Sequence, residues 1–347
     1  GGPLTGSGGK IIVTIPEGYA GDLFYFCTNH SGMVQQFTVH GDTPLNDSNF
    51  RSAILLWFDA EENATAIYGH ISDWNTSAVS DMSNAFLDRA EFNEEIGEWD
   101  VSNVVTMDYM FRNASLFNKD IGRWDTSSLD SMVGMFRGAS VFNKSIDSWD
   151  VSKVTSIHHL FNGAAAFNQP LNGWDVSNVN TMVQTFYNAK AFNHPLDEWN
   201  TSKVTSLNHM FNGAEAFNHP LNNWDVSRVG HMGSIFFGAK AFNQSLSRWD
   251  VSSAWVMNNI FHGTTSLSSN NKGLIHEAFG SNSNWPYDWR EFVVLDDTNF
   301  QSAVNLWFDN QTDANKTYGH ISDWNTSAVT DMSEAFKNRT DFNEDIS

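Results

Sequence analysis

Three side chains near the start of the chain have the chemistry of a metal site. Cys27, His30 and Met33 are separated by two residues each, in the pattern C-x2-H-x2-M. A thiolate, an imidazole and a thioether on one loop are ligands of a type 1 copper site. Such a site takes a second histidine, and none precedes His30 in this sequence. The set is therefore incomplete here, and the other interpretation is that the three are incidental residues of a β-hairpin.

The sequence on either side of this loop favours β-strands. Residues 10–15 and 24–27 are expected to lead into the loop, and residues 33–39 to lead out of it. Gly32 permits the sharp reversal between them. The segment is therefore predicted to contain antiparallel strands joined by a ligand-bearing loop.

Residues 8–41 resemble the last hairpin of a cupredoxin, in which a Cys–His–Met loop joins the two final strands. The resemblance implies that Cys27 is the thiolate ligand, His30 the imidazole ligand and Met33 the weak axial ligand. It also implies that residues 1–41 are the C-terminal strands of a partial cupredoxin-like domain, and that copper is bound in the intact parent protein.

No other group of residues indicates catalysis. The sequence has no G-x-S-x-G motif, no phosphate-binding loop and no nucleophile–base spacing. His194 and His219 occupy the same position in adjacent units and are expected to form a surface pair on neighbouring turns. An aspartate that follows each repeated tryptophan is replaced by Asn75 and Asn200, and the dense carboxylates of calcium-binding solenoids are lacking. We therefore predict that the protein is not an enzyme.

An unbroken 25-residue repeat dominates the chain. An FN dipeptide begins each unit, at Phe92, Phe117, Phe142, Phe167, Phe192, Phe217 and Phe242. A tryptophan follows seven residues later, and an eighth lies one period upstream: Trp74, Trp99, Trp124, Trp149, Trp174, Trp199, Trp224 and Trp249. Such spacing is typical of a solenoid, in which each unit buries its apolar face against its neighbours. The asparagine of each FN pair is expected to bond the backbone of the adjoining loop.

The apolar positions inside one unit predict a helix. Val179, Met182, Phe186 and Ala189 recur at positions i, i+3, i+7 and i+10, which traces one helical face. The stretch around 171–174 leaves room for one short strand. The predicted fold is therefore an α/β repeat, a right-handed leucine-rich-repeat-like solenoid with short parallel strands on one side and helices on the other.

The phenylalanine that ends each apolar stripe is predicted to be buried in the core of its turn. These residues are Phe111, Phe136, Phe161, Phe186, Phe211, Phe236 and Phe261.

The repeat resembles the bacterial surface leucine-rich-repeat group of BspA type, in its 25-residue variety long described as a domain of unknown function. The match runs over residues 71–266, with WDVSNV at 99–104 and 174–179 and WDVSKV at 149–154. The resemblance implies an extracellular or cell-surface protein with a role in adhesion or protein interaction. It implies no catalytic residues.

A second array begins near the end of the sequence. Residues 300–346 restate residues 50–96, including the motif YGHISDWNTSAV. An amphipathic helix predicted at 49–58 is expected to cap the first array, and it returns at 299–308. The predicted organisation is a cupredoxin-like segment at 1–41, a cap at 42–70, eight repeats at 71–266, a C-terminal cap and linker at 267–291, and the cap and first repeat of a truncated second array at 292–347.

Charge and composition narrow the function. The chain has 40 Asp plus Glu against 19 Lys plus Arg, a net charge of −21, which disfavours nucleic acid and anionic membranes as partners. One cysteine rules out an intrachain disulfide, and no segment approaches the ~20 apolar residues of a membrane span. The chain is expected to be a fragment of a secreted protein whose signal lies upstream.

Three functions are compatible with these features. The leading one is a non-catalytic extracellular or surface protein that mediates protein interaction or adhesion, with a protein or glycan on another cell or matrix as its partner. The first alternative is a copper-binding or electron-transfer protein that uses the solenoid as a spacer. The second is a carbohydrate-binding module, which requires tryptophan rings that face solvent.

Overall fold

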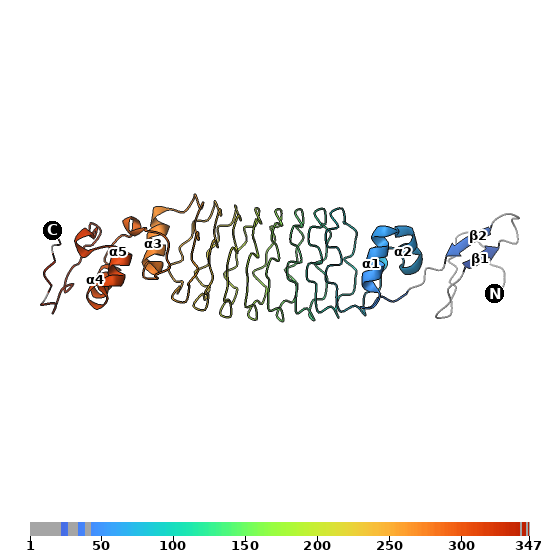
Figure 1. Cartoon of the computed structure of the whole chain (residues 1–347), viewed down its shortest axis with the longest axis horizontal. Coiled ribbons are helices and arrows are strands. Elements are labelled where there is room, and N and C mark those ends of the chain that lie inside the picture. The colour runs from blue at the N-terminus through green and yellow to red at the C-terminus, as the bar shows by residue number, and fades with distance from the viewer. Residues whose placement is uncertain (1–21, 27–33, 39–42, 341, 345, 347) are drawn as a thin grey trace.

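The computed structural model describes residues 22–26, 34–38, 43–340, 342–344 and 346. A stack of coils runs along the long axis of the molecule, with helices α1 and α2 at one end and α3 at the other (Figure 1). Helix α1 spans Phe50–Asp59 and α2 spans Glu61–Tyr68, followed by a 3-10 turn at Ile71–Asp73.

The other end of the stack is closed by α3, and the second cap follows it. Helix α3 spans Ser269–Phe279, and a 3-10 turn lies at Arg290–Phe292. Helices α4 (Phe300–Asp309) and α5 (Gln311–Tyr318) repeat α1 and α2, with a 3-10 turn at Ile321–Asp323. The helices predicted at 49–58 and 299–308 are thus confirmed.

In the N-terminal segment the structure describes one β-hairpin. Strand β1 (Asp22–Phe26) pairs antiparallel with β2 (Val34–Thr38), with Asp22 opposite Thr38 and Phe26 opposite Val34. This pair lies within the predicted cupredoxin-like segment, residues 1–41, and does not by itself establish such a domain.

The prediction of an α/β solenoid is wrong. Between residues 74 and 268 the chain forms neither a helix nor a regular strand, and neighbouring coils are joined by isolated parallel bridges such as Thr181 with Ser206. Gln184 and Asn188, inside the expected helix, have φ of 57° and 54°. A right-handed helix cannot contain such left-handed residues.

Backbone hydrogen bonds explain why turns replace the helix. The amides of Gln184 and Phe186 donate to the carbonyls of Asn208 and Met210 in the next coil, over 3.0 and 2.9 Å. The intervening amide of Thr185 donates over 3.3 Å to the carbonyl of Met182, three residues back. Amides therefore alternate between a local turn and the neighbouring coil, whereas helical amides bond four residues back.

The side chains are nevertheless buried where the repeat predicts. All seven phenylalanines of the stripe, from Phe111 to Phe261, are buried, which confirms that prediction. The tryptophans from Trp74 to Trp249 are also buried and lie in one file, with ring centroids of Trp199 and Trp224 6.3 Å apart and nearly parallel. Successive tight turns place the same side chains inward as an amphipathic helix would, so burial is right although the helix is wrong.

Each array has a core of its own. One continuous cluster runs from Leu45 to Phe279, with Trp285, Tyr287 and Trp289 packed against its end. Separate clusters surround Phe300 and Trp307 in the second cap. The first array therefore buries its apolar surface without help from α4 and α5.

Candidate interaction surface

A surface of unusual composition lies where coils bond to one another. In each coil, one segment forms the alternating turns and inter-coil bonds described above; in one coil it is residues 180–188. We call the outward side chains of this segment and its equivalents the ladder face. In the last five coils these segments are residues 155–163, 180–188, 205–213, 230–238 and 255–263.

These five segments contain no Asp, Glu, Lys or Arg. Charged residues make up 17% of the chain, and the net charge is −21, so their absence from all five segments sets this part of the ladder face apart. The first three coils differ, since their equivalent segments carry Asp81, Asp108 and Arg137 among others. The ladder face is therefore charged at the α1 end and uncharged over the remainder.

Imidazoles, amides and aromatic rings take the place of charges. Asn162 Nδ2 donates to Gln184 Oε1 over 2.8 Å and lies 3.1 Å from His159 Nδ1. The same arrangement recurs two coils later, where Asn212 Nδ2 lies 3.0 Å from His209 Nδ1. These side chains are half-buried and hold one another in place across the surface.

The histidines of this network are uncharged at neutral pH. Burial, helped by the neighbouring His158 and Arg137 charges, lowers the pKa of His159 to about 4. Burial also lowers the pKa values of His158 and His209 below their ordinary value of 6.5. The imidazoles therefore act as neutral donors and acceptors on this face.

The α3 end of the ladder face carries its most exposed ring. The Trp255 side chain is 61% exposed, and its ring meets the His231 ring edge-on with centroids 4.2 Å apart. The indole lies over Gly230, where a Cβ would come 2.5 Å from Trp255 Nε1. Phe237 and His262 stack on the neighbouring part of the face, with centroids 4.9 Å apart.

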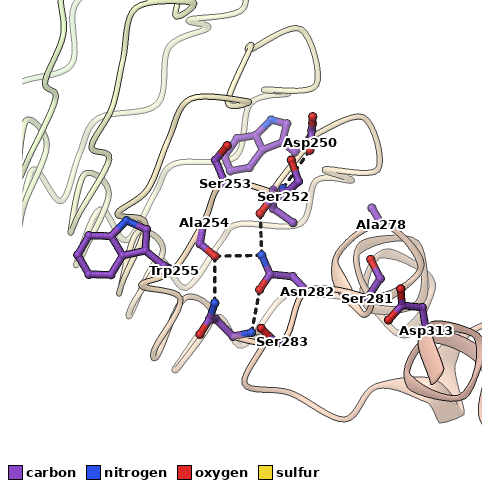
Figure 2. A pocket seen from close by; sticks show the side chains of 13 residues that line it. Asp250, Ser252, Ser253, Ala254, Trp255, Ala278, Ser281, Asn282, Ser283 and Asp313 are labelled. Atoms are coloured by element: carbon purple, nitrogen blue, oxygen red, sulfur yellow. Dashed lines mark hydrogen bonds between the residues drawn. The ribbon is translucent and has the colours of Figure 1, made fainter.

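A hollow of about 410 Å³ lies between the last coil and the second cap, beside Trp255 (Figure 2). Its main polar side chain is engaged in closing the array, since Asn282 Nδ2 donates to Val251 O over 2.7 Å and to Ala254 O over 3.0 Å. Asn282 Oδ1 accepts from the Asn284 amide over 2.7 Å. The hollow is therefore part of the end cap.

The other residues predicted to form sites either contact backbone carbonyls of the neighbouring coil or lie outside the described residues. Cys27, His30 and Met33 lie outside them, so the copper set stays a prediction. His194 and His219 do lie on neighbouring coils, each with Nε2 near a backbone carbonyl, Asn168 O at 3.2 Å and Asn193 O at 3.1 Å. Among the described residues no group of three His, Cys, Asp or Glu could hold a metal ion.

The aspartates that follow the repeated tryptophans stabilise the turns in which they lie. Asp175 Oδ1 accepts the Ser177 amide over 3.0 Å, and hydrogen bonds from Ser177 lower the pKa of the carboxyl group. The same bond recurs at Asp150, Asp225 and Asp250. This row is a set of turn-stabilising carboxylates.

The ladder face was missed at the sequence level because the unit was assigned to a helix. Aligning the successive units beneath one another would have shown the loss of charge in the last five.

Among the described residues no helix is long and apolar enough to cross a membrane.

Comparison with known proteins identifies one family. A family model described as "Mycoplasma protein of unknown function, DUF285" matches residues 57–174, 157–274 and 293–347. Neither the curated proteins nor the solved structures gave a match. The three matches cover both arrays and show tandem repetition of one kind of unit.

Proposed function

Because the chain belongs to the DUF285 family of tandem-repeat proteins of unknown function, with residues 57–274 and 293–347 matched, we propose a function from its surface. We propose that it is a non-catalytic extracellular interaction or adhesion protein that binds a protein partner through the ladder face of its last five coils. The resemblance of the repeat to bacterial surface proteins supports the extracellular location in this proposal.

The observation that carries this proposal is that the five ladder segments between residues 155 and 263 contain no charged residue. Centres of protein interfaces are depleted in Lys, Glu and Asp and enriched in aromatic residues, because burying an unpaired charge is costly. Tyr187, Phe237 and Trp255 supply rings of the kind that anchor such interfaces. Neutral imidazoles and amides supply hydrogen bonds without that desolvation cost.

Burial of the tryptophan file weakens the carbohydrate alternative. The Trp74 to Trp249 side chains are only 2–4% exposed, and from Trp99 onward each indole donates to a backbone carbonyl of the preceding coil. These rings do not face solvent and cannot stack on a sugar. The copper alternative rests on Cys27, His30 and Met33 alone.

The experiment measures binding of the chain to a panel of purified extracellular-matrix and cell-surface proteins by surface plasmon resonance. We expect saturable binding to a panel member that falls at least about tenfold, or about 1.4 kcal/mol, when Tyr187→Glu and Trp255→Glu place charges on the ladder face. Ser145→Glu, at an exposed position outside the ladder segments, is the matched control and should leave binding unchanged.

Salt dependence provides a second readout. An uncharged interface should keep its affinity as ionic strength rises, because there is little charge to screen. No saturable binding across the panel, binding that survives both ladder-face substitutions, or binding that salt abolishes would each contradict the proposal.

A further inference from the structure

Two arginines occupy one column of the ladder face, near its α1 end. Arg112 and Arg137 hold the same position in neighbouring coils, 25 residues apart. The residues before them, Phe111 and Phe136, stack with ring centroids 5.7 Å apart, and the Asn113 amide donates to Arg137 O over 2.7 Å. The two half-buried arginine side chains therefore extend from backbones that are hydrogen bonded to each other.

Neither guanidinium group has a counter-ion within the part of the chain that the structure describes. No ion pair there includes Arg112 or Arg137. The acidic residues of the same two ladder segments are Asp108 and Asp130, and neither of them forms an ion pair either. Asp108 Oδ1 instead accepts from Ser131 Oγ over 2.6 Å. The column thus carries two positive charges that no carboxylate balances directly.

A second column shows how charges on neighbouring coils are balanced elsewhere in this chain. Glu215 Oε1 lies 3.7 Å from Lys190 Nζ, and Glu215 Oε2 lies 2.8 Å from Lys240 Nζ. These three residues hold the same position in successive coils, so the sign of the charge alternates along the column. Like charges at adjacent positions repel each other. An anion bound between the two arginines would give their column the same alternation.

One donor of the arginine column is also without an acceptor. Arg112 Nε is buried and has no hydrogen-bond partner among the described residues. The Tyr109 ring, 5.7 Å from the guanidinium carbon, lies over Gly134, where a Cβ would come 2.5 Å from Tyr109 Cε1. A buried N–H that lacks an acceptor is destabilising, which favours a ligand that supplies one. Turning the guanidinium edge outward presents Nε–H and a terminal N–H together, the paired donors that an oxyanion accepts.

The next coil adds neutral donors to this region. The pKa of His159 is lowered by burial first, and then by the charges of His158, Arg137 and Arg112, so both arginines lie near its ring. Asn162 Nδ2 is a donor only, so His159 Nδ1, 3.1 Å away, is the acceptor of that contact. The neutral His159 ring therefore carries its proton on Nε2 and adds a further N–H without adding negative charge.

We propose that Arg112 and Arg137, together with the His159 imidazole, form a binding site for one sulfate or phosphate group, either as the free ion or as an ester of a small molecule. Two cations match a dianionic group, whereas a single carboxylate would balance only one of them. The net charge of −21 repels polyanions, so the group belongs to a small ligand. The arginines lie outside the five uncharged segments, and this site does not rest on the protein partner proposed for them.

The test titrates the full chain while NMR follows the arginine Nε–H resonances. The probes are inorganic sulfate, inorganic phosphate, glucose 6-sulfate, glucose 6-phosphate, acetate and a heparin oligosaccharide, with ionic strength held constant by sodium chloride. We expect saturable shifts of the Arg112 and Arg137 resonances with sulfate or phosphate, and weaker binding of acetate. Tighter binding of the inorganic ions would identify a free ion as the ligand, and tighter binding of the sugar esters an ester.

Three substitutions show whether the shifts report this site. Arg137→Gln, followed at Arg112, should weaken binding at least about tenfold. Arg112→Lys, followed at Arg137, keeps the charge but lacks Nε–H and the planar fork, and should weaken binding as well, which provides a second variant should Arg137→Gln lower stability. Arg123→Gln is the matched control, because that guanidinium is exposed and lies 3.8 Å from Glu98, and it should leave binding unchanged.

Several results would overturn the proposal. These are the absence of a saturable shift with sulfate and phosphate, an equal shift with chloride alone, and acetate or heparin bound more tightly than every sulfate and phosphate probe. Full affinity in Arg112→Lys, or equal weakening by Arg123→Gln and Arg137→Gln, would overturn it too.

Discussion

Asn168 shows how one side chain ties successive coils together. Its amide donates to Asn143 Oδ1 over 2.9 Å, and its own Oδ1 accepts the Asn193 amide over 2.9 Å. The same bond links each FN asparagine to the next, and the last one, Asn243, accepts the Ser268 amide before α3. The predicted asparagine ladder is thus confirmed.

Replacing Asn168 with Ala should lower stability by about 1–3 kcal/mol, because the Asn193 amide loses its acceptor. Urea unfolding followed by tryptophan fluorescence measures the change. Asn180→Ala, at an exposed position of the same coil, should stay within about 0.5 kcal/mol of the parent. Equal effects at the two positions would show that the ladder contributes nothing specific.

Phe186 tests the core at the same scale. Its ring lies 5.6 Å from those of Phe161 and Phe211 and 4.1 Å from that of Phe192, measured between centroids. Phe186→Ala should cost about 3–5 kcal/mol, since a cavity would open in a continuous stack. Phe237→Ala removes a half-buried ring from the ladder face and should cost clearly less in the same unfolding titration.

At the scale of elements, the junction of α3 with α5 is expected to depend on pH. Burial holds the pKa of His276 below 6.5, opposed by the Lys316 carbonyl and by Asp288, with Arg290 acting in the same direction as burial. In this junction His276 Nδ1 accepts from Trp285 Nε1 over 2.8 Å, and its Nε2 lies 3.1 Å from Lys316 O of α5. A protonated Nδ1 could no longer accept from Trp285. The neutral ring is favoured when docked, so the stabilisation is complete above pH 6.5 and is lost as pH falls below it toward the folded pKa.

Hydrogen exchange of the α5 amides measures this dependence. After correction for intrinsic rates, protection should fall as the pH drops below 6.5. His276→Gln keeps one donor and one acceptor and does not titrate, so it should flatten the profile. A pH dependence that persists in this variant would assign the effect to another group.

At the scale of the molecule, stability is a sum over neighbouring coils. Phenylalanine and tryptophan rings stack from coil to coil at intervals such as 6.1 Å between Phe167 and Phe192 and 6.4 Å between Trp224 and Trp249. Each coil therefore interacts with only the coils beside it, as in other solenoids. We therefore expect that a whole coil can be removed without loss of the fold, whereas a deletion that shifts the 25-residue register cannot be tolerated.

Two deletions test this. Removing residues 180–204 joins Val179 to Thr205 and leaves every column in register, so cooperative melting near the parent temperature is expected. Removing residues 180–203 leaves one extra residue in the ladder segment, where amides bond to both neighbouring coils, and should lower the melting temperature sharply. Similar melting of both variants in circular dichroism would contradict the register argument.

The sequence by itself determined the repeat, the buried columns, the asparagine ladder and the two caps. An identical residue at the same place in each unit, as with Phe186 and Phe211, leaves only one register in which like side chains meet. The caps at residues 50 and 300 followed from direct repetition and an apolar helical face. These features depend on the spacing of residues along the chain and on which of them are apolar, and both can be read from the sequence.

Only the tertiary structure decided between helix and turn. The apolar positions of the unit suit both, but the acceptor for the Gln184 amide is the Asn208 carbonyl, which belongs to the next coil. The contact of α5 with α3 likewise depends on segments that meet in space. A helix satisfies its backbone within one unit, whereas these coils satisfy theirs only against a neighbour, so the unit considered alone predicts the wrong backbone.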